Sequence, residues 1–432
     1  MSISLAKSYS KEDIKLDSPE ERQTAYDIAA QSVVLLENNG ILPLKDVKNV
    51  LVTGPNANSI WAMCGDYTYP AMSYFWKMVM DVADRDNPHI VKLLEAMTAK
   101  KPGDINLMYS RGCDWTEDIE TKYSELGDAR AWEYELLHRK VDSGEKADKA
   151  EALSMAKDAD VIIAAVGENV MLCGENRDRE GLGLPGKQEQ YVEELIKTGK
   201  PVVLVMFGGR ALVVSGLAEK CAAVIQAWYP GEEGGNAVAD ILYGKISPSA
   251  KLSVSYPNTE LNEPVCYNSL TSHPSPLTSK IQWPFGYGLS YTTFEYQNLQ
   301  VNSEAQTSDD FVELTFQVKN TGDMAATEIA QIYLSPTDST QQIRPIQLQG
   351  FARIALEPGQ TKTVTTRLYV EQLGFYSHQG NVRQWNIEPG TYTFKVGASS
   401  ADIRLQQQLI LRGTTVTKPL RDHYFSESTV SL

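Results

Sequence analysis

The first part of the chain alternates short apolar runs with amphipathic segments. Five apolar runs have the length of a strand and are rich in Val, Ile and Leu: NVLVTG (49–54), INLMYS (105–110), VIIAAVG (161–167), PVVLVMFGG (201–209) and AVIQAW (223–228). The segments between them, such as IVKLLEAMTAK and EQYVEELIKTGK, carry apolar residues at helical spacing. Apolar strands that alternate with helices indicate a layered α/β sandwich with a mostly parallel sheet covered on both faces.

Two helix starts can be predicted from local signals. Ser18 is a suitable N-cap, and Glu21 completes a capping box with it. Apolar residues then follow helical spacing as far as Leu36, and Asn38-Asn39-Gly40 is expected to end this helix. A second helix is predicted to begin at Pro185, because proline is favoured at the first helical position.

The pattern changes to a period of two near residue 290. In FVELTFQVKNTGD (311–323), apolar residues at 312, 314, 316 and 318 alternate with polar ones before a turn at Asn320-Thr321-Gly322. TEIAQIYLS, QTKTVTTRLY and GTYTFKVGAS continue in the same way, with the turns EPGQ and EPGT nearby. This alternation is typical of an antiparallel β-sandwich of about 100 residues.

These patterns divide the chain into five parts. The linker begins with a stretch rich in Pro, Ser, Thr and Asn, and the C-terminal tail is polar, which predicts that the tail is loosely ordered. The parts are an N-terminal extension (1–17), an α/β domain (18–255), the linker (256–295), the β-sandwich (296–412) and the tail (413–432).

The composition is that of a soluble globular protein, with 42% hydrophobic and 22% charged residues. The net charge of −15 comes without a basic patch, so nucleic acid is not expected as a partner. No apolar run approaches the roughly 20 residues that span a bilayer, so no membrane partner is expected either. The first residues lack the apolar region of a signal peptide, and the sequence leaves open whether the protein is cytoplasmic or exported by an upstream signal.

The cysteines and histidines indicate neither a metal site nor a disulfide framework. The cysteines are odd in number and scattered without a CxxC pair, and the histidines are isolated from one another. We therefore expect no metal ion and no cofactor. These residues are Cys64, Cys113, Cys173, Cys221 and Cys266, and His89, His138, His273, His378 and His423.

One charged loop is a candidate for chemistry. It follows the apolar run 161–167 and contains Glu168, Glu175, Asp178 and Arg179. In parallel α/β sheets the ligand crevice forms beyond the carboxyl ends of the strands, and this loop leaves such an end. The alternative is a solvated surface loop with loose ion pairs, each contributing about 0–1 kcal/mol.

Several stretches occur together in a fixed order over residues 18–296. They are SVVLLENNGILPL (32–44), VLVTGPNANS (50–59), GDYTYPA (65–71), GENRDREGLGLPGKQEQYVEEL (174–195), KPVVLVMFGGRAL (200–212), QAWYPGEEGGNAVADILYG (226–244) and PFGYGLSYTTFEY (284–296). Together they resemble the carboxyl-terminal part of glycoside hydrolase family 3, which includes β-glucosidases and β-xylosidases. RPIQLQGFARIALEPGQTKTV and WNIEPGTYTFKVGASSADIRL resemble the domain that ends many members, which implies an all-β immunoglobulin/fibronectin type III-like sandwich.

The resemblance implies retaining hydrolysis of a β-glycosidic bond by two carboxylates about 5–5.5 Å apart. In the family an aspartate nucleophile comes from an amino-terminal (β/α)8 barrel, and the acid/base glutamate precedes a stretch like Asp-Arg-x-x-Leu-x-Leu-Pro. Residues 178–185 match that stretch, and Glu175 is the matching glutamate. Burial against a docked barrel is expected to raise the pKa of Glu175 and keep it protonated. Glu168 is the second choice, because it is nearer the strand.

Other positions are interpreted by their place in the family blocks. Asp66 and Tyr67 in GDYTYP are expected to line the sugar crevice, and Arg179 is also assigned to substrate binding. The alternative for GDYTYP is a turn that packs locally. Asp114 in GCDW is interpreted as the end of a strand's loop and not as a relocated nucleophile, and Tyr229 is interpreted as a packing residue.

The sequence departs from the family at its N-terminus. Only 17 residues precede the helix that Ser18 caps, whereas a barrel needs about 250. We therefore expect the chain by itself to be nearly inactive. The expected partners are a β-linked saccharide or glycoside and a separate barrel chain, with a homo-oligomer left open. The rival interpretation is a non-catalytic carbohydrate-binding or scaffolding protein derived from such an enzyme.

Overall fold

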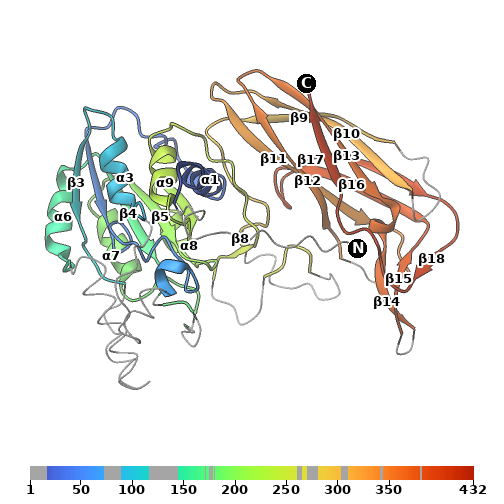
Figure 1. Cartoon of the computed structure of the whole chain (residues 1–432), viewed down its shortest axis with the longest axis horizontal. Coiled ribbons are helices and arrows are strands. Elements are labelled where there is room, and N and C mark those ends of the chain that lie inside the picture. The colour runs from blue at the N-terminus through green and yellow to red at the C-terminus, as the bar shows by residue number, and fades with distance from the viewer. Residues whose placement is uncertain are drawn as a thin grey trace, which may run out of the picture.

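Two domains lie side by side in the structure, which is a computed structural model (Figure 1). One is an α/β domain and the other is built from antiparallel strands, and the short strand β8 (Ile281–Trp283) lies between them. The described residues are 17–72, 89–115, 145–170, 172–174, 179, 181–259, 265–269, 281–302, 310–340, 344–379 and 382–432.

A six-stranded sheet forms the centre of the α/β domain, with the strand order β1-β6-β5-β4-β2-β3. All neighbours are parallel except β1, which runs antiparallel to β6 at one edge. The five apolar runs of the sequence are confirmed as strands. They are β2 (Asn49–Thr53), β3 (Asn106–Ser110), β4 (Val161–Gly167), β5 (Val202–Phe207) and β6 (Ala223–Trp228), and the sixth strand is β1 (Val34–Asn38).

Helices cover both faces of this sheet and create two separate hydrophobic cores. On one face α3 (Leu93–Lys100) and α9 (Gly234–Leu242) pack against the strands, with α1 (Pro19–Ala30) against α9. On the other face lie α6 (Lys149–Asp158), α7 (Gln188–Ile196) and α8 (Ser215–Ala218). Successive residues of β4 enter alternate cores: Ile162 belongs to the second and Ile163 to the first. Burial on both faces explains why these strands are apolar throughout.

The helix near the N-terminus is shorter than the sequence predicts. The capping box is confirmed, since the Ser18 side chain accepts from the backbone N–H of Glu21 and the Glu21 side chain accepts from that of Ser18. The extension to residue 38 is wrong, because the helix ends at Ala30 and β1 begins at Val34. Val34 and Leu35 are fully buried in opposite cores, an arrangement that an edge strand provides and a surface helix does not.

Two four-stranded antiparallel sheets form the β-sandwich, in the orders β19-β13-β10-β9 and β12-β11-β16-β17. The predicted alternation is confirmed on β10, where Val312, Leu314, Phe316 and Val318 are all fully buried. The strands are β9 (Phe294–Asn302), β10 (Phe311–Asn320), β11 (Ala326–Pro336), β12 (Gln347–Leu356), β13 (Thr361–Tyr369), β16 (Gly390–Gly397), β17 (Ile403–Leu411) and β19 (Glu427–Ser431).

The C-terminal tail is part of the sandwich, so the prediction that it is loosely ordered is wrong. β18 (Val416–Lys418) pairs with β15 (Val382–Ile387), which also pairs with β14 (Phe375–Gln379), and β19 pairs with β13. The buried Glu371 carboxylate accepts from the Lys418 ammonium group and from the backbone N–H groups of Asp422 and His423. The polar composition of the tail reflects its position at the sheet edge and not a lack of structure.

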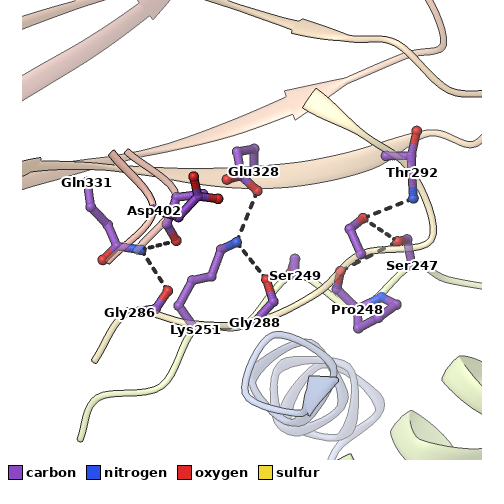
Figure 2. A network of polar contacts seen from close by, with 12 residues as sticks. Ser247, Pro248, Ser249, Lys251, Gly286, Gly288, Thr292, Glu328, Gln331 and Asp402 are labelled. Carbon is purple, nitrogen blue, oxygen red and sulfur yellow. Dashed lines mark hydrogen bonds and ion pairs between the residues drawn. The ribbon is translucent and has the colours of Figure 1, made fainter. Parts of the chain in front are cut away.

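Buried polar contacts join the two domains along the end of the linker (Figure 2). The Lys251 ammonium group of the α/β domain donates to the Gly288 carbonyl at 2.8 Å and lies 3.3 Å from the Glu328 carboxylate of β11. Only 11% of the Lys251 side chain and 3% of the Glu328 side chain are exposed, so this ion pair is shielded from water. Gln331, also on β11, donates to the Gly286 carbonyl at 2.9 Å. The linker is thus hydrogen-bonded to the α/β domain through Gly288 and to the β-sandwich through Gly286.

Candidate functional site

Polar side chains gather where the central parallel strands end. Glu168 follows β4 directly, Arg210 lies three residues after β5, and Tyr229 follows β6. Asp66 belongs to the segment after β2. Because the carboxyl ends of parallel strands meet at one edge of the sheet, these residues come from four neighbouring loops.

Glu168 is the centre of this group. Its side chain has no exposed surface, and each carboxylate oxygen faces a guanidinium group. Oε1 accepts from Nε of Arg179 at 2.9 Å and lies 2.8 Å from Nη2 of the same arginine, and Oε2 accepts from Nε of Arg210 at 3.0 Å. Charge-assisted hydrogen bonds of this kind are about twice as strong as neutral ones. Two cations share one carboxylate, so these three side chains together carry net positive charge.

Two glycines allow β4 and β5 to end close enough for these contacts. Gly167 has φ 122°, and a Cβ on it would lie 2.0 Å from the carbonyl oxygen of Phe207. Gly208 has φ 133°, and a Cβ there would be 3.2 Å from Cβ of Glu168. Both conformations are costly for residues with a side chain. The glycines therefore bring Glu168 and the loop of Arg210 together.

Arg179 and Arg210 also contact the loop backbone. Nη2 of Arg179 donates to the Gly183 carbonyl at 2.8 Å, and Nη1 of Arg210 donates to the carbonyl of Arg179 at 3.4 Å. Burial opposes the charge on Arg210, but the Glu168 carboxylate and the Cys173 thiol outweigh this effect, and the pKa of Arg210 is raised. Arg210 therefore stays charged.

Glu175, the first choice for the acid/base residue, lies outside the described residues, as does Asp178. The structure does describe Arg179, which follows Glu175 in the chain, and the carbonyl of Arg179 accepts from Arg210. The structure therefore brings Glu168 together with Arg179, whereas the sequence had assigned these two residues to separate roles.

Asp66 and Tyr67 lie in a turn near the same edge. Asp66 is half-buried and Tyr67 is 67% exposed. The ring of Tyr229 lies between this turn and the Arg210 loop: a Cβ on Gly65 would be 3.9 Å from the ring, and one on Gly209 would be 3.2 Å from it. Tyr229 thus packs the loops together, in agreement with its interpretation as a packing residue.

Sequence reasoning missed Arg210 as a site residue. The stretch GGRAL directly follows an apolar run, and an arginine at the carboxyl end of a predicted parallel strand is the signal that could have identified it.

Burial raises the pKa of the neighbouring Tyr229 phenol, and Cys173 and Glu168 raise this pKa further. Tyr229 is therefore neutral near neutral pH.

The segment around Asp114 is held by an ion pair within its own loop and by a contact with the loop after β2. Nε and Nη2 of Arg111 donate to Oδ1 of Asp114 at 3.1 and 2.7 Å, and Nε1 of the buried Trp115 donates to Asn56 at 2.5 Å. This arrangement agrees with the interpretation of Asp114 as the end of a strand's loop.

The predicted helix start at Pro185 is displaced, because Gly186 has φ 57° and α7 begins at Gln188.

Neither a metal cluster nor a membrane span is found in the described ranges. No group of three or more His, Cys, Asp or Glu side chains there could hold a metal ion. Among the helices of the same ranges, none combines the length and the apolar character needed to cross a bilayer.

Comparisons with known proteins give a consistent result for both domains. Residues 33–291 match the Glycosyl hydrolase family 3 C-terminal domain, and residues 328–400 match the Fibronectin type III-like domain. A beta-xylosidase of Formosa agariphila is 31% identical over 404 residues, which are 90% of this chain and 50% of that protein. A periplasmic beta-glucosidase of Salmonella typhimurium is 32% identical over 409 residues, which are 91% of this chain and 50% of that protein.

A solved structure agrees with these relatives. The crystal structure of a beta-glucosidase from Listeria innocua in complex with isofagomine superposes with a TM-score of 0.74 at 27% identity, covering 94% of this chain and 51% of that one. This chain spans about half the length of the curated relatives it matches.

Proposed function

The chain belongs to glycosyl hydrolase family 3, and from this premise we propose that it supplies the general acid/base residue of a retaining β-glycosidase. The acid/base residue is Glu175. One observation supports the assignment: Arg179, four positions after Glu175, lies at the carboxyl edge of the sheet, where its guanidinium group pairs with Glu168 and its carbonyl accepts from Arg210. This edge is where open α/β sheets bind ligands.

The reaction proceeds in two steps, and Glu175 transfers a proton in each. In the first, the Glu175 carboxylic acid donates its proton to the glycosidic oxygen while the bond from that oxygen to the anomeric carbon breaks. A second carboxylate, about 5–5.5 Å from the first, forms a bond to the anomeric carbon. In the second step the Glu175 carboxylate removes a proton from water, the water oxygen attacks the anomeric carbon, and the nucleophile is released.

The second carboxylate comes from polypeptide outside these 432 residues, in the same protein or in another. The matched regions of this chain are the C-terminal domain of the family and the fibronectin type III-like domain. Asp114, the aspartate of the GCDW segment, is already paired with Arg111 in its own loop, which makes it a poor candidate for the nucleophile.

Asp66 and Tyr67 contact the saccharide in this proposal, together with Arg179. Carboxylate and guanidinium groups suit sugar hydroxyls as hydrogen-bond acceptors and donors. The exposed ring of Tyr67 offers an apolar face for the C–H side of a sugar ring. The substrate is a terminal β-glucosyl or β-xylosyl unit, because the relatives include proteins named beta-glucosidase and beta-xylosidase.

Reconstitution of a complete enzyme tests this function. The chain is combined with a barrel-bearing polypeptide of the family, and hydrolysis of an aryl β-glucoside and an aryl β-xyloside is measured. We expect Glu175→Gln to lower kcat about 10²–10⁴-fold, as loss of a general acid does.

The matched control is Glu189→Gln, which makes the same change at an exposed glutamate of α7 and should leave kcat unchanged. Saccharide binding without hydrolysis in the reconstituted protein would contradict the proposal and favour a non-catalytic carbohydrate-binding protein.

A further inference from the structure

We propose that Glu168 is a positioning residue, which holds the loop that carries Glu175 by fixing Arg179 and tying it to Arg210. The inference rests on the proposed function, because it concerns how the same site is held in place. It also assigns a role to Arg210, a residue 42 positions away from Glu168 in the sequence.

The ion pair between Glu168 and Arg179 closes the loop at its base. The two residues are 11 positions apart, and Glu175 lies between them in the sequence. Glu168 begins the loop and Arg179 ends it. Arg179 is fixed further by its hydrogen bond to the Gly183 carbonyl, and the carbonyl of Leu182 accepts from the backbone N–H of Val213 at 2.7 Å. Closure at the base reduces the conformations open to the segment and hence the entropy cost of ordering its acid group.

Arg210 fixes the same loop to a second strand. Its Nε donates to the Glu168 carboxylate at 3.0 Å, and its Nη1 donates to the backbone carbonyl of Arg179 at 3.4 Å. Glu168 and Arg179, at the two ends of the loop, are therefore attached to one side chain, whose own backbone follows β5. Neither Glu168 nor Arg179 can move relative to β5 without breaking these contacts.

The contacts of Glu168 suit positioning and not proton transfer. Its side chain has no exposed surface, and each of its two oxygens accepts from an arginine, so neither is directed at a substrate. A general acid must come within hydrogen-bond reach of the leaving oxygen. Removal of the Glu168 carboxylate leaves two partly buried guanidinium groups without their shared anion, which destabilises the folded state.

Hydrogen exchange on the chain alone tests whether Glu168 holds the loop. In Glu168→Gln, amides of residues 169–183 should exchange at least about tenfold faster than in the unmodified chain, because the base of the loop is no longer closed. Amides of β10 and β13, in the other domain, should be unaffected. Glu189→Gln is the matched control and should leave exchange in residues 169–183 unchanged. Unchanged exchange in Glu168→Gln would overturn the proposal.

A double variant separates loop positioning from global stability. Glu168→Gln with Arg210→Met removes one anion and one cation, so its melting temperature should be closer to that of the unmodified chain than the single variant's. Its loop should still exchange rapidly, because both anchors are absent. If Glu168→Gln alone fails to fold, hydrogen exchange is measured on the double variant instead. Slow exchange in the folded double variant would contradict the positioning role.

Kinetics of the complete enzyme distinguish this proposal from the proposed function. Glu168→Gln should lower kcat about 100-fold for a glycoside with a poor leaving group, because displacement of a catalytic group by about 1 Å costs this much. The effect should be smaller for a dinitrophenyl glycoside, whose leaving group needs no proton, and KM should change little. Acceleration of Glu168→Ala by azide would identify Glu168 as the acid/base residue and overturn both assignments. An unmodified enzyme without activity would refute the proposed function, and hydrogen exchange would still decide the role of Glu168.

Discussion

A carboxylate without exposed surface requires partners, and Glu168 has two. An unpaired buried charge is costly, so the fold retains Glu168 only together with Arg179 and Arg210. Both arginines keep part of their surface exposed, at 17% and 24% of the side chain. The buried anion therefore fixes the positions of both guanidinium groups.

The conformation of Gly208 should be necessary for this cluster. Gly208→Ala introduces a Cβ at φ 133°, 3.2 Å from Cβ of Glu168, so we expect a loss of about 1–3 kcal/mol in the free energy of unfolding. Gly216→Ala is the control, because its Cβ would meet no atom within 4 Å and it lies in α8. Denaturant unfolding of both variants measures the difference. Equal stability of the two variants would contradict the close approach of Gly208 to Glu168.

At the residue scale the sequence predicts that polar side chains follow the central strands, but not how these side chains pair. The loop with Glu168, Glu175 and Arg179 could be identified from its place after an apolar run. The pairing of Glu168 could not, because one partner lies 42 positions away on another loop and ion pairing leaves no periodic signal in sequence. Burial and ion pairing define the position of Glu168, and neither can be read from its residue type in the sequence.

At the element scale, the strands of the two domains followed from hydrophobic pattern alone. β2 to β6 are continuous apolar runs and β10 alternates strictly, so burial on two faces or on one could be inferred directly. The failures lie where distant contacts decide. β1 continues an apparent helical pattern but pairs with β6. The polar C-terminal segment forms β18 and β19 by pairing with β15 and β13, and Lys418 of β18 also bonds Glu371.

The contacts of Glu371 predict a pH dependence of the C-terminal strands. Burial raises the pKa of Glu371, but hydrogen bonds from Lys418, His423 and Asp422 outweigh it and lower the pKa to about 2, from 4.5. The ionised form is thus favoured in the folded state, and its contribution to stability, about 3 kcal/mol, is complete above about pH 4.5. This contribution is lost as the pH falls toward 2.

Unfolding of the unmodified chain and Glu371→Gln should therefore be compared between pH 6 and pH 2.5. We expect the difference in unfolding free energy to shrink steadily below about pH 4.5. Glu427→Gln, at an exposed position of β19, should differ little from the unmodified chain at any pH. A difference for Glu371→Gln that stays constant with pH would contradict this assignment.

At the scale of the whole molecule, the joint between the domains is built like a core and not like a flexible linker. The Lys251–Glu328 pair is buried, and Glu328 also accepts from the hydroxyl of Tyr296 at 2.7 Å. Aromatic contacts lead from the α/β domain into the linker, because the Tyr256 ring lies 6.3 Å from the Trp228 ring and 5.6 Å from the Trp283 ring. We therefore expect the two domains to unfold together.

Calorimetry of Lys251→Met tests this coupling. Loss of the ammonium group leaves the Glu328 carboxylate buried, which should cost about 3–5 kcal/mol and split a single unfolding transition into two. Lys251→Met combined with Glu328→Gln should recover part of the loss. The control is Lys220→Met, which breaks an exposed ion pair with Glu193 and should cost less than about 1 kcal/mol. Two transitions in the unmodified chain would show that the domains unfold independently.

The assignment of Glu175 is the central claim, and azide tests it most directly. In the complete enzyme, Glu175→Ala should turn over a dinitrophenyl glycoside slowly, because the glycosyl-enzyme intermediate forms without an acid but lacks a base to activate water. Azide needs no base, so it should raise the rate and give a glycosyl azide with retained β configuration. Formation of this product in Glu168→Ala and not in Glu175→Ala would contradict the account.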